Sequence, residues 1–302
     1  MQNKVKVIVK KHLEQGNILN IPLTVTPKEG VLRYIRYSLK ENNKLLVVTP
    51  NPEQIMRAQE DKLYAQILHN AQISLPDGVG LLAGSAFMQK KLPENKFVRV
   101  IAGLFYGLYL GLGVLFWKDK IKSAFKITKG RDFVVDLVAL ANKLSLKVYL
   151  LGARSGAAQT AIANLAKNYK SVAFKASDAP ELDENGKPKT KQDEFFEKQV
   201  IKDINKFKPN FLIVGIAPPK QEKWLYHNWN GLDFQCAMVC GATIDYIAGN
   251  LPYPPQILSI MGLEWLWRLV TSFKTGKSLK RIFSAFPRFP LMIFKVKILG
   301  DN

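Results

Sequence analysis

The chain has 302 residues, of which 47% are hydrophobic and 23% are charged, a balance typical of one large globular domain or two small ones. Its formal net charge of +20 favours an anionic partner, such as nucleic acid, a membrane surface or a phosphorylated substrate, over a basic surface that is merely solvated. The two cysteines, Cys236 and Cys240, exclude a disulfide framework, and without a C-x-x-C pair or a His cluster they do not predict a zinc site.

The N-terminal stretch "MQNKVKVIVKKHLEQGN" has neither the apolar core nor the cleavage site of a secretory signal, so we expect a cytoplasmic protein. Apolar strand-like runs then alternate with helical periodicity, which predicts an α/β fold: a Rossmann-like, mostly parallel sheet flanked by helices, over residues 1–250. The polar segment 178–194 is expected to be an exposed, mobile loop, and both cysteines are expected to be buried thiols. The predicted strands are 44–51, 72–75, 147–152, 171–177, 209–217 and 234–242, and helical segments are predicted at 52–71, 131–146, 153–169 and 195–207.

An apolar insert at about 97–122 interrupts this pattern, and its central part, Ile101–Trp117, has no charged residue. As a helix this part would be roughly 26 Å long, close to the about 30 Å of a bilayer core. A single crossing would put loops of one sheet on opposite sides of the membrane, so we favour a helix or tight hairpin that dips into the membrane. The alternatives are a buried helix, an interface helix in a homo-oligomer, and a true span. Gly103, Gly107 and Gly111 share one face, which is suited to close packing against another helix.

Beyond residue 250 the prolines cluster and the alternation of strands and helices stops. Residues 273–302 contain seven Lys or Arg, five Phe and one Asp. We therefore expect residues 251–302 to form a basic, aromatic appendage that associates with an anionic membrane surface.

Ligands of an open parallel sheet bind at the carboxyl ends of its strands, and two loops at such ends carry suitable side chains in the first part of the chain. Thr49 and Asn51 in "TPNPE" suit sugar hydroxyls or phosphate, although a helix cap is the plainer reading. Asp77 in "PDGVG" is placed for a general base, with a turn-forming Asp-Gly as the alternative.

Two further strand ends lie in the second part of the chain. Gly152 in "LLGARSGAAQ" precedes a helix whose first amides suit a phosphate. Lys220 and Gln221 in "VGIAPPKQEKW" suit a nucleotide diphosphate or a sugar, with a proline-led helix start as the alternative. No strand is followed by a D-x-D pair, so we expect neither metal nor cofactor, and the charge of a leaving diphosphate would be offset by Lys, Arg and helix N-termini.

Seven blocks of the sequence together resemble the WecG/TagA/CpsF glycosyltransferases in content and order. They are "VVTPNPE", "LPDGVG", "KGRDF", "YLLGARSGAA", "GIAPPKQEKW", "GATIDYIAG" and "GLEWLWRL". The resemblance runs from about Ile18 to Arg281, and "PPKQE" and "GLEWLWRL" are its most specific parts.

The resemblance implies an inverting, metal-independent bacterial enzyme, peripheral on the inner face of the cell membrane. It would transfer an N-acetylhexosamine, most often N-acetylmannosamine, from a UDP-sugar donor to a polyprenyl-diphosphate-linked acceptor in cell-surface polysaccharide or teichoic acid synthesis. The first alternative is another donor sugar, glucose or N-acetylglucosamine, in exopolysaccharide assembly. A membrane scaffold or a nucleic-acid-binding module is more remote, and no nucleic acid partner is expected because aromatic and basic residues interleave only in the tail.

The resemblance also implies site residues. Asp77 would be the catalytic base, and Arg268, Lys280 and Arg281 would be candidates for contacting the acceptor diphosphate. The substrate-binding residues would be Thr49, Asn51, Gly152, Lys220, Gln221, Glu222 and Asp245.

Three positions depart from the family pattern. Ile127 stands where the family usually has an arginine, and Lys126, Lys129 and Arg131 are the nearby cations that would take its place. In addition, Ala217 replaces a glycine before "PKQE", and Tyr253 replaces the arginine of an "RAP" block.

Overall fold

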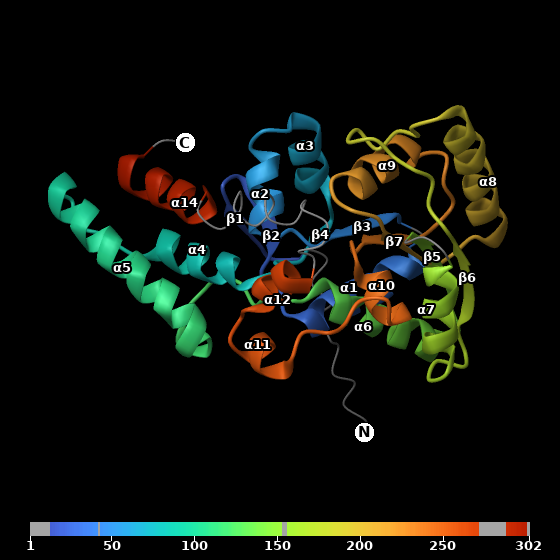
Figure 1. The fold of residues 1–302 in the computed structure, drawn as a ribbon, viewed down its shortest axis with the longest axis horizontal. Coiled ribbons are helices and arrows are strands. Elements are labelled where there is room, and N and C mark those ends of the chain that lie inside the picture. Colours follow the sequence, from blue (N-terminus) through green and yellow to red (C-terminus); the bar gives the residue numbers. More distant parts are fainter. Residues whose placement is uncertain (1–12, 42, 153–155, 272–287, 301–302) are drawn as a thin grey trace, which may run out of the picture.

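The computed structural model describes residues 13–41, 43–152, 156–271 and 288–300. Its centre is a six-stranded sheet in which every neighbouring pair of strands is parallel, in the order β4-β3-β8-β7-β5-β6 (Figure 1). The α/β prediction is therefore confirmed. The strands are β3 (Leu45–Val48), β4 (Ile73–Ser74), β5 (Lys147–Gly152), β6 (Ala173–Ser177), β7 (Phe211–Gly215) and β8 (Cys236–Val239).

The strands are apolar runs because helices cover both faces of the sheet. Alternate residues enter two separate cores: Val148 and Leu150 of β5 face one, and Tyr149 and Leu151 face the other. The helices α2 (Pro52–Ala58), α3 (Lys62–Asn70), α8 (Lys191–Phe207) and α9 (Lys220–Asn228) pack on the Tyr149 side. The helices α1 (Lys28–Lys40), α6 (Gly130–Leu144), α7 (Ala157–Ala166) and α10 (Thr243–Ala248) pack on the Val148 side.

The prediction of one helix over 52–71 was wrong, because the structure divides this segment into α2 and α3. Asp61 begins α3 as its N-cap and accepts a hydrogen bond from the Tyr64 amide at 3.0 Å. The same carboxylate lies 2.6 Å from the buried ammonium of Lys223 on α9. The break therefore serves to join α3 to α9.

A short antiparallel hairpin, β1 (Gln15–Ile18) and β2 (Ile21–Thr24), precedes α1 and was not predicted. Asn17 and Pro22 interrupt the apolar pattern of its four-residue strands.

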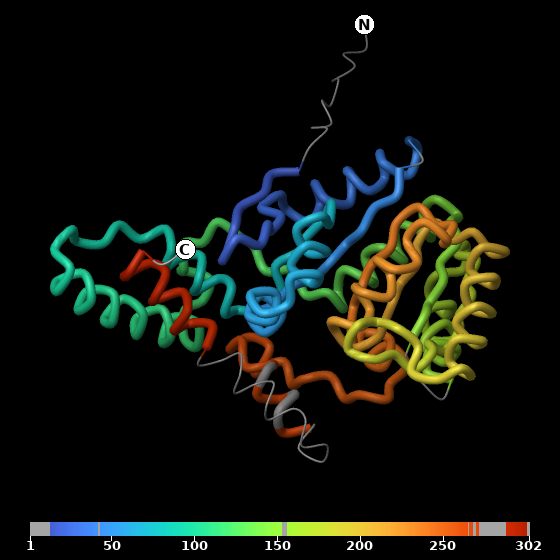
Figure 2. The backbone as a smooth tube through the Cα atoms, turned by 90° about the horizontal axis from the view of Figure 1, so that it is seen from above, coloured from blue at the N-terminus to red at the C-terminus, as the bar shows by residue number. Residues whose placement is uncertain are grey.

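Figures 1 and 2 show α4 (Val79–Gln89), α5 (Lys96–Phe116) and α14 (Arg288–Leu299) side by side at one end of the molecule, opposite α8. The apolar insert is thus one continuous helix and not a tight hairpin. A Cβ at Gly103 would lie 2.8 Å from Ile298 of α14, and one at Gly107 would lie 3.7 Å from Phe87 of α4. The predicted close packing is confirmed at these two glycines, but Gly111 meets nothing within 4 Å.

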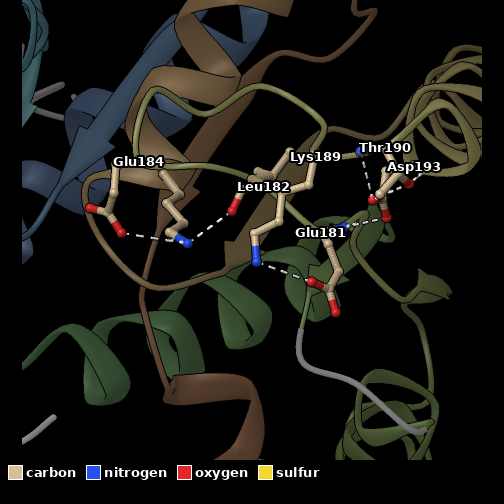
Figure 3. A network of polar contacts seen from close by, with 7 residues as sticks. Glu181, Leu182, Glu184, Lys189, Thr190 and Asp193 are labelled. Atoms are coloured by element: carbon tan, nitrogen blue, oxygen red, sulfur yellow. Dashed lines mark hydrogen bonds and ion pairs between the residues drawn. The ribbon is translucent and has the colours of Figure 1, made fainter.

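The polar segment after β6 is tied to its neighbours, in contrast to the mobile loop that its composition indicated. Leu182 is buried and forms a β-bridge with Pro188. Figure 3 shows the polar contacts at its base, where the Glu181 amide donates to the Asp193 carboxylate at 3.0 Å and Lys189 pairs with Glu181 at 3.2 Å. The segment therefore follows a defined path beside α8 and α9.

After α10, the described residues contain two short helices, α11 (Gln256–Ile260) and α12 (Glu264–Thr271), then α14, and no further strand. The predicted end of the βα alternation is confirmed for this part. Lys280 and Arg281 lie outside the described residues, as do the other residues of 272–287.

Candidate active site

The loops at the carboxyl ends of β3, β4, β7 and β8 surround a cavity of about 360 Å³. From β3 the chain passes through α2 and α3, on one face of the sheet, to the neighbouring strand β4. After β8 the chain enters α10, which packs against α7 on the opposite face. Neighbouring strands whose connections diverge in this way leave a crevice, which is where open α/β sheets bind ligands. Five of the predicted site residues line it: Thr49, Asn51, Asp77, Gln221 and Asp245.

Asp77 is held beside the loop that follows β3. Its backbone N–H donates to the Pro50 carbonyl at 3.0 Å, directly after the last ladder bond between the two strands. The next residue, Gly78, has φ +92° and is the N-cap of α4. Only glycine adopts this conformation without strain, so the Asp-Gly pair turns the chain and leaves the Asp77 side chain in the cavity wall.

Asn51 is a helix cap as well as a cavity-lining residue. Its side chain accepts a hydrogen bond from the Gln54 amide at 2.9 Å, and the Gln54 side chain accepts one from the Asn51 amide at 2.9 Å. Thr49 packs against the first residue of α6, because a Cβ at Gly130 would lie 3.1 Å from the Thr49 hydroxyl oxygen. The glycine therefore sets how closely α6 approaches the loop after β3.

Gln221 is almost fully buried at the start of α9 and connects two strand ends. Its carbonyl oxygen accepts from the Gly241 amide after β8 at 3.0 Å, and its amide nitrogen donates to Glu222 at 3.0 Å. A glutamine side chain has one further acceptor and one further donor position, so Gln221 retains hydrogen-bonding capacity.

Glu222 and Lys220 lie outside the cavity lining. Burial raises the pKa of Glu222 to about 7. Hydrogen bonds, of which the one from Gln221 is the strongest, lower this pKa but do not outweigh burial. Lys220 points to the polar segment after β6, where its ammonium donates to the Leu182 carbonyl at 2.8 Å and lies 3.6 Å from Glu184. The structure thus separates these two from the predicted site residues that meet at the cavity.

Gly152 does not line the cavity either, although it pairs with Gly215, which does. It has φ +135°, and a Cβ there would lie 2.4 Å from the Gly215 carbonyl oxygen on the neighbouring strand. Close backbone packing between β5 and β7 explains this glycine without a ligand.

Two cations that flank Gly130 also line the cavity, and both bind one carboxylate of the C-terminal segment. The Lys129 ammonium lies 2.5 Å, and the Arg131 guanidinium 2.9 Å, from the same oxygen of Glu264 on α12. Burial acts to raise the pKa of Glu264, but the hydrogen bond from Lys129 and the charge of Arg131 outweigh it, so this pKa lies below its ordinary value. Ile127 instead packs against the core on the Tyr149 side of the sheet.

The guanidinium of Arg131 lies against a pair of neighbouring aromatic rings, whose centroids are 5.3 Å apart. Its carbon lies 5.7 Å from the ring centroid of Tyr246 and 5.6 Å from that of Tyr253. From the sequence, Lys129 and Arg131 were predicted only as substitutes for the family arginine that Ile127 replaces. Their position in "KGRD", at the start of a helix, is the signal that places them beside Thr49.

Arg268 lies in α12, but its side chain is outside the described part, like Lys280 and Arg281. The structure therefore does not place the three residues assigned to an acceptor diphosphate. Among the described residues, no group of three or more His, Cys, Asp or Glu is arranged to hold a metal ion. Cys236 and Cys240 are buried thiols, as predicted, and burial raises the pKa of each to about 12.

The sequence model of the glycosyl transferase WecG/TagA/CpsF family matches residues 16–102 and 95–301. The chain belongs to this family. It is therefore a glycosyltransferase, and the two matched segments overlap at residues 95–102, where α5 begins.

Similar proteins include two from Staphylococcus aureus strains MRSA252 and NCTC 8325 / PS 47. Each is named N-acetylglucosaminyldiphosphoundecaprenol N-acetyl-beta-D-mannosaminyltransferase. Each is 24% identical to this chain over 260 residues, which cover 86% of this chain and 82% of the relative. The similarity therefore extends over most of both proteins.

Proposed function

We propose that this glycosyltransferase moves N-acetylmannosamine from a UDP-sugar to an N-acetylglucosamine linked by diphosphate to a polyprenol. The observation that carries the proposal is the convergence of Thr49, Asn51, Asp77, Gln221 and Asp245 from four strand ends on one cavity. The names of the relatives supply the sugar and the acceptor.

The proposed reaction is a single displacement with inversion. Asp77 takes the proton of the acceptor hydroxyl while the hydroxyl oxygen attacks the anomeric carbon of the donor. The new carbon–oxygen bond forms as the bond from the anomeric carbon to the diphosphate breaks, and UDP leaves with that electron pair. Because attack and departure occur on opposite faces, the anomeric configuration is inverted.

Four other side chains of the cavity wall are proposed to hold the substrates. Thr49, Asn51, Gln221 and Asp245 offer hydroxyl, amide and carboxylate groups that hydrogen-bond sugar hydroxyls and the uracil or acetamido group. Lys220, Glu222 and Gly152 lie outside this wall, so we assign them to shaping the loops that carry it.

The enzyme is proposed to work as a peripheral protein on the cytoplasmic face of the membrane, with α5 in contact with the bilayer. This helix is long and apolar enough to cross a membrane by length and composition alone, and only 17% of its most apolar window is buried. Its outward side exposes large apolar residues along the whole helix, including Phe97, Leu104, Phe105, Leu108 and Phe116. An apolar face along the membrane surface would keep the cavity near the head of a lipid-linked acceptor.

Basic residues on both flanks of α5 and in the C-terminal segment support an anionic membrane surface as a partner. The acceptor-diphosphate role of Arg268, Lys280 and Arg281 remains part of this proposal. The flanking cations are Lys90, Lys91, Lys96 and Arg99 before the apolar stretch and Lys118, Lys120 and Lys122 after it.

The test is a transferase assay on the full-length protein with a short-chain N-acetylglucosaminyl diphospholipid acceptor. UDP-N-acetylmannosamine, UDP-N-acetylglucosamine and UDP-glucose are supplied in turn, each with EDTA or with Mg²⁺ or Mn²⁺. The proposal predicts product from UDP-N-acetylmannosamine in every arm. Product only from another donor would change the sugar, and product only with a divalent ion would overturn the metal-independent mechanism.

A further inference from the structure

The charge balance of the cavity wall singles out two side chains. Its carboxylates are Glu53, Asp77, Asp245 and Glu264, and among the described residues its cations are Lys129 and Arg131 alone. A substrate that carries a diphosphate brings two or more negative charges into this wall. Among the described residues of the wall, its diphosphate is therefore best stabilised where the two cations stand.

Arg131 is fixed before any ligand arrives. The guanidinium lies against the adjacent rings of Tyr246 and Tyr253, its side chain is only 11% exposed, and one of its terminal nitrogens, Nη2, donates to Glu264 at 2.9 Å. The other terminal nitrogen, Nη1, is buried without a hydrogen-bond partner. A buried donor left unpaired in this way costs free energy, and an anion that reached it would remove that cost.

The pair keeps a net positive charge towards the cavity even though carboxylates bind it. Lys129 and Arg131 share the carboxylate of Glu264. A second carboxylate, that of Asp132, lies 3.5 Å from the Arg131 Nε, but it is outside the cavity lining and 63% exposed, so solvent screens it. Both residues stand at the first turn of α6, a 15-residue helix whose positive dipole end adds to the same potential.

We propose that Lys129 and Arg131 bind the diphosphate of a substrate, with Glu264, Tyr246 and Tyr253 as positioning residues. This rests on the proposed function and names the part of the site that recognises the substrate charge. A guanidinium presents two parallel N–H groups to phosphate oxygens, which an ammonium cannot do, so Arg131 supplies the geometry and Lys129 supplies charge. The diphosphate is that of the nucleotide donor or that of the lipid acceptor.

A merely structural role is the competing account, because the same contacts join α6 to α12. The two accounts differ in whether a substitution weakens the binding of ligands that carry phosphate more than the binding of ligands that do not. Binding of UDP, geranyl diphosphate and uridine is measured by isothermal titration calorimetry for the wild type, Arg131→Gln, Arg131→Lys and Lys129→Met. Arg57→Gln is the matched control, since Arg57 pairs with Glu184 outside the cavity.

We expect Arg131→Gln to weaken binding of at least one diphosphate tenfold or more while uridine binds within twofold of wild type. Arg131→Lys should restore part of that loss, Lys129→Met should weaken the same ligand three- to tenfold, and Arg57→Gln should change nothing. A loss for UDP alone assigns the pair to the donor, and a loss for geranyl diphosphate alone assigns it to the acceptor.

The proposal is overturned if both diphosphates bind Arg131→Gln and Lys129→Met within twofold of wild type, or if uridine binding falls in parallel with UDP binding. Lys129→Met also provides the test if Arg131→Gln does not fold, because Lys129 is about one-third exposed and less enclosed. A failure of the proposed function would look different, because the wild type would then bind these diphosphates without transferring a sugar.

Discussion

At the scale of single residues, the cavity wall depends on contacts that leave little free space. Gly130 is the clearest case, because its backbone touches Thr49 at the point where α6 meets the loop after β3. A side chain at position 130 would displace the Thr49 hydroxyl and not merely fill a gap.

Gly130→Ala should therefore lower kcat/KM for sugar transfer at least tenfold while the free energy of unfolding stays within about 1 kcal/mol of wild type. The alanine methyl would lie 3.1 Å from the Thr49 hydroxyl oxygen, whereas alanine is favoured over glycine in a helix by up to about 1 kcal/mol. Steady-state kinetics and urea unfolding measure the two effects. Gly231→Ala is the control, since its new methyl would meet only Asn228 at 3.7 Å; unchanged kinetics in Gly130→Ala would show that Thr49 is not placed by this contact.

Glu222 makes a separate prediction about pH. Burial raises its folded pKa to about 7, above the ordinary 4.5, so between these values the folded protein binds more protons than the unfolded chain. Stability from this group is therefore present at low pH and is lost as pH rises through about 7.

The free energy of unfolding of Glu222→Gln should consequently be close to that of the wild type at pH 5. At pH 8.5 it should exceed that of the wild type by up to about 3 kcal/mol, since each pKa unit corresponds to about 1.4 kcal/mol. Urea unfolding at the two pH values measures the difference, with exposed Glu41→Gln as the control. An equal stability change at both pH values would contradict a buried, proton-binding carboxyl.

At the scale of elements, the sequence predicted those strands and loops that depend on the local pattern of apolar and polar residues. The six central strands follow from their apolar runs, and the residues after β3, β4, β7 and β8 follow from the rule that parallel strands end at one edge. What could not be predicted depends on distant partners. The break at Asp61 reflects Lys223 on another helix, and the position of the Arg131 guanidinium reflects its hydrogen bond to Glu264, which lies 133 residues further along the chain.

Helix α5 carries the prediction at this scale. Its side towards α4 and α14 is packed through Gly103 and Gly107, so the opposite apolar side is available to lipid. Leu104→Gln with Leu108→Gln should reduce flotation with anionic liposomes at least threefold and leave the melting temperature within about 2 °C, because both side chains are more than half exposed.

The matched control for α5 is Phe195→Gln, which removes an equally exposed apolar side chain from α8 at the opposite end of the molecule. It should float like the wild type. Equal flotation of the wild type and the α5 double variant would assign membrane contact to the basic residues alone.

At the scale of the whole molecule, the structure has two regions of different character, and the candidate cavity belongs to the first of them. The parallel sheet and its helices hold the site residues in place, and α4, α5 and α14 extend from that body as an apolar-faced end (Figure 2). The formal charge of +20 and the exposed side of α5 both suit an enzyme whose acceptor lies in an anionic membrane.

The central claim is that the strand-end cavity, with Asp77 as base, performs inverting sugar transfer to a lipid diphosphate acceptor. The most direct test is single-turnover transfer from UDP-N-acetylmannosamine by the wild type and Asp77→Asn, with exposed Asp233→Asn as the control. The account predicts a product of inverted anomeric configuration and a rate for Asp77→Asn that is lower by about 10²–10⁴-fold, with unchanged UDP binding. Transfer by Asp77→Asn at the wild-type rate, or a product of retained configuration, would contradict it.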